Sequence, residues 1–136
     1  MKGVVASVVP WFHPLFGLVT VALLFRAAKR GLAIRRGTVH ERYLEHPTLA
    51  FLTWLLVLVN WVLGLATVWL VRDDLEVAAS THFQAGTALL AVLTVTGLVS
   101  LWIADPRVRR VHPMLCAVAV LLAGIQVFLG LQMTRW

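Results

Sequence analysis

Long apolar runs, each closed by a short polar or charged segment, recur along the whole chain. A helix of about twenty such residues crosses the roughly 30 Å hydrocarbon core of a bilayer. The Leu, Val and Ala residues inside each run are continuous, whereas a membrane β-strand needs polar and apolar positions to alternate. The pattern predicts four transmembrane helices, at about 10–30, 47–71, 82–104 and 113–134.

These four runs fill the sequence, so we expect a single transmembrane domain over residues 1–136. The expected fold class is an all-α membrane protein, a four-transmembrane-helix antiparallel up-down bundle. The composition agrees, with 60% hydrophobic and 13% charged residues, far from the balance of a soluble domain. Lys2 before the first run is typical of a signal peptide, but no small-residue cleavage site follows the run, which therefore reads as a retained helix.

Several residues suit helix starts. Pro14, Pro47 and Pro113 fit a first turn, where the missing N–H costs little. Ser80 and Thr81 are candidate caps for the third helix. The sequence therefore predicts that these helices begin close to those residues.

Charge is distributed unevenly between the connections. Nine of the twelve Lys and Arg residues lie at 26–42 or 107–110, and the connection between the second and third helices carries Asp73, Asp74 and Glu76. The positive-inside rule then places both termini on the non-cytoplasmic side, and we expect a bacterial inner (cytoplasmic) membrane. Because the net charge of +6 comes from these short loops, it indicates orientation in a lipid bilayer and no nucleic-acid partner.

The six tryptophans divide into two groups. Four fall near predicted membrane interfaces, as in an aromatic belt: Trp11, Trp69, Trp102 and Trp136. Trp54 and Trp61 lie deeper, and we interpret them as packing residues.

The sequence lacks the residues that most catalytic and metal-binding sites need. Cys116 is the only cysteine, which excludes an intrachain disulfide, a CxxCH haem attachment and a cysteine cage for zinc or iron–sulfur. No Ser/His/Asp set, paired intramembrane carboxylates or phosphate-binding glycine loop is found. No catalytic residue is predicted, and a bound metal would depend on histidine.

Four of the five histidines each stand near the start of a different predicted helix. Because successive helices alternate in direction, His13 and His82 should lie near the outer face, and His46 and His112 near the inner face. An imidazole pair on facing helices at one depth is what a six-coordinate b-type haem needs. The sequence predicts two haems b, each held by one such pair, with these four histidines as the iron ligands.

Small residues recur at fixed distances from these histidines. Gly64 follows His46, and Gly130 follows His112, by eighteen residues, which is five helical turns or roughly 27 Å. Each glycine should therefore lie near the level of the other pair and make space for its macrocycle. Gly17 and Gly86, four residues after His13 and His82, would let a ring approach one turn below a ligand. Ordinary packing of small residues between helices explains each glycine equally well.

Helices two and four resemble copies of each other. Each opens with His-Pro and carries an amide fourteen residues after the histidine, Asn60 or Gln126, and then a Leu-Gly-Leu. This symmetry suggests duplication of a helical hairpin. The two amides could bond each other, a haem propionate or a quinone, with a simple interhelical bond as the favoured alternative.

The remaining polar residues have plainer interpretations. A single histidine near a helix start is most often an interfacial residue or a cap. His40, in the basic connection, is expected to be a solvated loop residue, with the lining of a redox-partner or quinone site as the alternative. Cys116 is expected to be a small buried residue. Four basic residues near the inner pair are either topology signals or partners for propionates: Arg26, Lys29, Arg30 and Arg110.

Trp-Phe-His13-Pro14-Leu15, together with His112-Pro113-Met114, resembles the cytochrome b561 family. In that family a His-Pro-Leu-x-Met motif opens the first core helix and supplies a haem ligand. The resemblance implies a four-helix core that binds two haems between the first and third and the second and fourth helices. Gly17 stands where the motif has methionine, and the family's extra helices at both ends have no counterpart, so small four-helix bacterial cytochromes are the expected relatives.

The expected function is transmembrane electron transfer by a b-type di-haem cytochrome, an oxidoreductase linked to a quinol or another small reductant. Its partner would be a redox protein or a quinone, and the chain would act as a homodimer or as a subunit of a larger redox complex. The alternative is a haem-free membrane anchor or assembly subunit of a multi-subunit complex.

Overall fold

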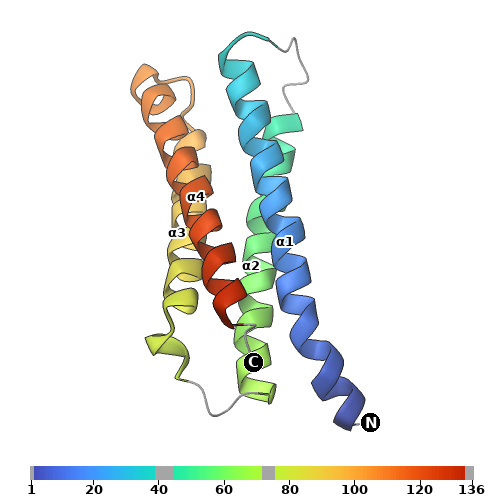
Figure 1. Ribbon diagram of the computed structural model, residues 1–136. Helices are drawn as coiled ribbons and strands as arrows, with labels where there is room; N and C mark the ends of the chain where they lie inside the picture. The colour runs from blue at the N-terminus through green and yellow to red at the C-terminus, as the bar shows by residue number, and fades with distance from the viewer. Residues whose placement is uncertain (1, 39–44, 72–75, 134–136) are drawn as a thin grey trace.

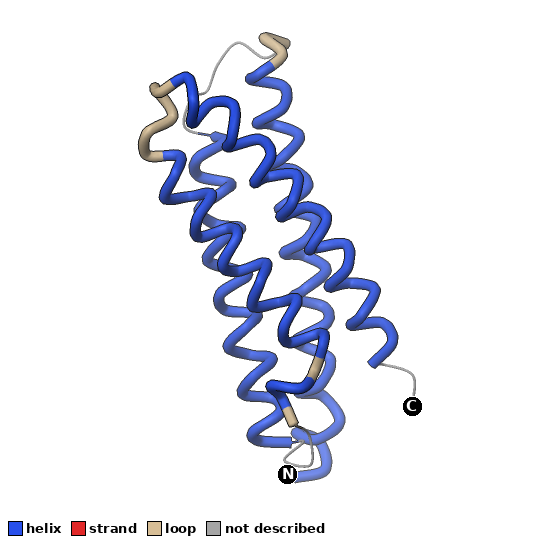
Figure 2. The backbone as a smooth tube through the Cα atoms, turned by 90° about the vertical axis from the view of Figure 1, so that its left-hand side faces the viewer, coloured by secondary structure: helices blue, strands red, loops and turns tan. Residues whose placement is uncertain are grey.

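The computed structural model describes residues 2–38, 45–71 and 76–133. Over these ranges the chain forms four α-helices and one short 3₁₀ helix, and no strand (Figures 1 and 2). The elements are α1 (Lys2–Arg35), α2 (Glu45–Val71), η1 (Val77–Ala79), α3 (Thr81–Ser100) and α4 (Pro106–Met133). The predicted all-α, four-helix fold is confirmed.

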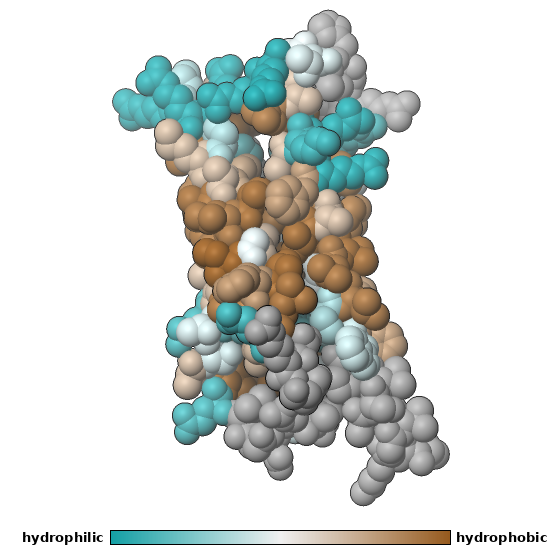
Figure 3. Space-filling model, in the orientation of Figure 1, coloured by the Kyte–Doolittle hydropathy of each residue, from teal (hydrophilic) through white to brown (hydrophobic). Residues whose placement is uncertain are grey.

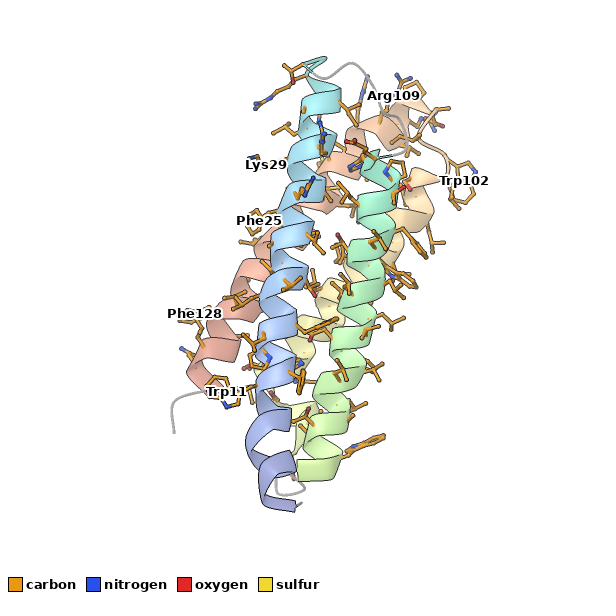
Figure 4. All side chains as sticks on the ribbon, turned by 90° about the vertical axis from the view of Figure 1, so that its right-hand side faces the viewer. Trp11, Phe25, Lys29, Trp102, Arg109 and Phe128 are labelled. Atoms are coloured by element: carbon orange, nitrogen blue, oxygen red, sulfur yellow. The ribbon has the colours of Figure 1, made fainter. Side chains whose placement is uncertain are left out.

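All four helices contain a segment long and apolar enough to cross a membrane: Trp11–Arg35, Glu45–Trp69, Thr81–Ser100 and Pro106–Met133. Figure 3 shows the corresponding apolar band across the middle of the face in view, with hydrophilic residues gathered toward its ends. Phe25 and Phe128 point away from the bundle (Figure 4), and many other large apolar side chains are also exposed. Such a surface suits contact with lipid rather than water.

The helix starts differ from two of the predictions. α1 already begins at Lys2 and α4 at Pro106, so Pro14 and Pro113 lie inside helices and not in their first turns. Asp105 explains the early start of α4, because its side chain accepts a hydrogen bond from the Arg107 amide (2.7 Å) and Pro106 takes the first helical position.

The third helix begins as predicted and ends earlier. Ser80 caps it by accepting a hydrogen bond from the Phe83 amide (3.4 Å). It ends at Ser100 rather than Ala104, because residues 101–104 form turns that lead into α4.

Nine described residues are buried, and all of them lie seven, eleven or fourteen positions after the histidine of their own helix: Thr20, Leu24, Ala27, Thr53, Val57, Leu89, Thr96, Ala119 and Ala123. This heptad-like spacing keeps one stripe of each helix on the bundle axis. Ala119 and Ala123 are fully buried, which lets α4 approach its neighbours closely. The buried hydroxyls are satisfied locally, as when Thr53 donates to the Leu49 carbonyl (2.7 Å).

The helices form a ring in which α1 packs on α2 and α3 on α4, while α1 also contacts α4 and α2 contacts α3 (Figure 1). α1 therefore lies diagonally across from α3, and α2 from α4. Two indole–hydroxyl hydrogen bonds join α2 to α3, from Trp54 to Thr94 (2.9 Å) and from Trp61 to Thr87 (3.0 Å). The two deeper tryptophans thus hydrogen-bond between helices as well as pack.

Candidate functional site

The interior of the bundle holds two pairs of histidines. His13 on α1 lies beside His82 on α3, with ring centroids 5.9 Å apart and ring planes at 82°. His46 on α2 lies beside His112 on α4, at 6.4 Å and 87°. Each pair joins diagonally opposite helices. The structure therefore brings together the same residues that the sequence groups by depth.

Main-chain carbonyl groups orient the first member of each pair. His13 Nδ1 lies 3.1 Å from the Asn60 carbonyl oxygen, and His46 Nδ1 lies 3.1 Å from that of Ala27. Because a carbonyl only accepts, the ring nitrogen must donate in both bonds. In a neutral imidazole this tautomer leaves the lone pair on Nε2, the nitrogen that is then free to bind a metal.

The second member of each pair has a donor beside Nε2. The Gln126 amide nitrogen lies 3.2 Å from His82 Nε2, and Cys116 Sγ lies 3.6 Å from His112 Nε2. The Nδ1 atoms of these two histidines are buried and make no hydrogen bond of good geometry within the described residues, although the main chains of Gln126 and Thr96 approach the two rings. An amide N–H only donates, so His82 Nε2 accepts and also carries its lone pair.

Glycines make room for these side chains. A Cβ atom on Gly64 would lie 2.8 Å from His13 Cε1, and one on Gly130 would lie 3.2 Å from His82 Cε1. The space next to Gly64 and Gly130 is thus filled by imidazole rings at the level of the His13–His82 pair. A Cβ on Gly17 would meet the Asn60 amide nitrogen at 3.3 Å.

Sequence reasoning did not single out Gly31, where a Cβ would lie 2.8 Å from His46 Cε1. The signal was available, because Gly31 follows His13 by the same eighteen residues that separate His46 from Gly64. Position eighteen is small in all four helices, with Ser100 as the fourth case. The repeat thus extends to α1 and α3, although those helices lack the amide at position fourteen.

The donor sets are small. The described residues contain no group of three or more His, Cys, Asp or Glu side chains that could hold a bare metal ion. Each site offers two imidazoles, which suits a metal that brings its other ligands with it, as haem iron brings four porphyrin nitrogens. Among the basic residues near the second pair, Arg30 forms an ion pair with Glu45 (2.7 Å), and His40 lies outside the described residues.

Comparison with known proteins identifies no relative of the chain. The chain matches no family model, no curated protein and no solved structure. The function of the two histidine pairs therefore has to be argued from their own geometry.

Proposed function

We propose that the chain is a transmembrane di-haem cytochrome of the b type, with one haem held by His13 and His82 and the other by His46 and His112. The observation that carries the proposal is the meeting of four histidines, one per helix, in two pairs across the bundle axis. Polar side chains in the interior of a membrane bundle are costly and usually functional.

The separation of the two rings in each pair would allow that pair to hold one haem. A metal–imidazole bond of about 2 Å on each side would put the centroids of two ligand rings roughly 6 Å apart. The observed separations of 5.9 and 6.4 Å bracket that value. Four buried polar atoms without a described partner lie on or beside these pairs: Asn60 Oδ1, His82 Nδ1, His112 Nδ1 and Gln126 Oε1.

The protein's own contribution is to hold and insulate the ligands. The Asn60 and Ala27 carbonyls fix His13 and His46 in the tautomer that presents Nε2. Between the two pairs lies the apolar core of Leu24, Val57, Leu89 and neighbouring residues, which excludes water. When bound, a haem supplies a one-electron iron couple. The contacts with the other pair fall fourteen to eighteen residues after the histidine of α1, α2 and α4, about 21–27 Å along the helix axis, which spans most of a bilayer core.

The proposal includes an antiparallel up-down arrangement with both termini outside the cytoplasm. On α1 and α2, His13 contacts Asn60 while Ala27 contacts His46. A higher residue number on α1 thus pairs with a lower one on α2, as in antiparallel helices. Lys29 and Arg109 lie toward one end of the bundle and Trp11 toward the other (Figure 4). The basic end would face the cytoplasm, by the positive-inside rule, in a bacterial inner membrane. A quinone or redox protein would exchange electrons with the chain. The chain itself would act as a homodimer or as a subunit of a larger complex.

One observation favours the second candidate function, a haem-free membrane anchor or assembly subunit. The Gln126 amide and the Cys116 thiol already occupy the Nε2 side of His82 and His112. In a haem-free protein His82 and His112 would keep these contacts permanently, and the histidine pairs would serve only to join diagonally opposite helices.

Purification in mild detergent with oxidised and dithionite-reduced spectra separates the two functions. The parent chain should show the Soret and α bands of haem b at two haems per chain. His13→Ala and His46→Ala should each lose one haem, because each removes one axial ligand. His40→Ala, which changes the remaining histidine, should keep both. A folded and colourless parent would rule out the cytochrome and leave the anchor.

A further inference from the structure

We propose that Gln126 is a positioning residue that caps the ligand nitrogen of His82 until haem displaces it. This inference rests on the proposed function. Gln126 Nε2 lies 3.2 Å from His82 Nε2. Because the amide nitrogen can only donate, the bond takes up the lone pair that iron would need. The amide thus holds His82 in its ligating tautomer and at the same time blocks it.

Gly86 leaves space for the Gln126 amide beside His82, and few hydrogen bonds hold the amide in that position. A Cβ on Gly86 would lie 2.8 Å from Gln126 Nε2, so the glycine leaves the space that the amide occupies. The other end of the same amide, Oε1, is buried and has no hydrogen-bond partner in the described part of the chain. Leaving His82 therefore costs Gln126 a single hydrogen bond.

The neighbouring helix provides an internal comparison. Asn60 follows His46 by fourteen residues, as Gln126 follows His112. Its side chain is one methylene shorter, and its amide nitrogen approaches Gly17 (3.3 Å from a Cβ built there). The Asn60 main-chain oxygen accepts a hydrogen bond from His13, and the Gln126 main chain likewise approaches His82. The two amide side chains differ, because only that of Gln126 lies beside a histidine Nε2.

If Gln126 caps His82, removing its amide should raise the affinity for haem, whereas removing a residue that only supports the fold should lower it. A net hydrogen bond of ordinary strength corresponds to roughly a two- to tenfold change in an equilibrium constant. Gln126→Leu removes the donor with little change in volume, so haem should bind the His13–His82 pair roughly two- to tenfold more tightly. If Gln126 only supported the fold, the same change would weaken haem binding.

The test titrates haem-free full-length protein in detergent with ferric haem, in a His46→Ala background that leaves one pair. Gln126→Leu should bind more tightly than its parent, and Asn60→Leu, which also removes an amide, should not. Gln126→Met serves as a second variant if the leucine variant does not fold. In a second measurement, ¹⁵N spectra of the haem-free protein should show the His82 ring signals shifted by Gln126→Leu and unchanged by Asn60→Leu.

Three outcomes would overturn the cap. In the first, Gln126→Leu and Gln126→Met bind haem no more tightly than the parent. In the second, Asn60→Leu produces the same gain. In either case the parent still binds haem, and the proposed function stands. If the parent of the series binds no haem while folded, the cytochrome proposal and the cap fail together.

Discussion

At the scale of single residues, the histidine sites depend on glycines in the facing helix, whose lack of a side chain leaves space for the imidazole rings. Gly64 leaves space for the ring of His13, since a Cβ there would lie 2.8 Å from Cε1. That ring cannot simply swing away, because its Nδ1 is bonded to the Asn60 carbonyl. A methyl group at position 64 must therefore displace the imidazole or weaken its hydrogen bond.

Gly64→Ala should consequently be less stable than Gly97→Ala. Both changes replace a helical glycine by a better helix former, but a Cβ on Gly97 would meet nothing within 4 Å. The difference should be about 1–2 kcal/mol, the cost of a disturbed buried hydrogen bond. Reversible unfolding of both variants in detergent measures it. Equal stabilities would show that His13 adjusts without cost and that Gly64 is not required.

At the scale of helices, the two hairpins are joined by contacts that sequence patterns do not reveal. Trp54 donates to the Thr94 hydroxyl across the α2–α3 boundary (2.9 Å). Interhelical bonds of this kind in membrane proteins contribute about 0.6 kcal/mol on average. Trp54→Phe, Thr94→Val and the double variant form a cycle whose coupling free energy should be about 0.5–1 kcal/mol in favour of the parent.

The unfolding free energies of the four proteins in detergent give this coupling directly. The same cycle on Trp69, whose side chain is 72% exposed, and Thr94 should give no coupling and serves as its control. Additive effects of Trp54→Phe and Thr94→Val would mean that the hydrogen bond adds nothing to the joining of the hairpins.

The helices themselves were predictable because apolar runs of membrane-spanning length admit few alternatives. Their ends were less so. Pro113 suits a first turn, but Asp105 and Pro106 form a stronger start seven residues earlier, and a proline inside a membrane helix is tolerated. An Asp-Pro pair before an apolar run is a signal that would have located this end.

The candidate site was predictable in its pairing and not in its contacts. One histidine per helix, combined with alternating helix directions, groups His13 with His82 and His46 with His112. The capping of His82 by Gln126 depends on the rotation of α4 relative to α3 and on side-chain rotamers. Apolar periodicity does not encode either quantity, because a small rotation leaves the same residues facing inward.

At the scale of the whole molecule, the chain is built as two similar hairpins. On α1, α2 and α4, position fourteen after the histidine contributes a main-chain or amide group to a neighbouring histidine, and position eighteen is small in all four helices. Each hairpin alone holds one member of each histidine pair. The paired sites therefore exist only when both hairpins associate, so assembly and any binding at the sites should be coupled.

The proposed orientation places the α2–α3 and α3–α4 connections on opposite sides of the membrane, and this can be tested at one exposed residue in each. Ala104, in the turns between α3 and α4, is exposed close to Arg107, Arg109 and Arg110, whereas Glu76 is exposed before η1 at the other connection. If the basic end faces the cytoplasm, these two positions lie on opposite sides of the membrane. Single cysteines introduced there, in a Cys116→Ser background, report their side through a membrane-impermeant thiol reagent.

In intact cells the reagent should label Glu76→Cys and leave Ala104→Cys unlabelled, while inverted membrane vesicles should give the opposite result. Labelling both after detergent treatment is the control for reactivity. Because the two positions are scored as a pair, a reversed pattern would invert the proposed topology and leave the bundle intact. Labelling of both from one side would place the α2–α3 and α3–α4 connections together, which is incompatible with an α3 that crosses the membrane.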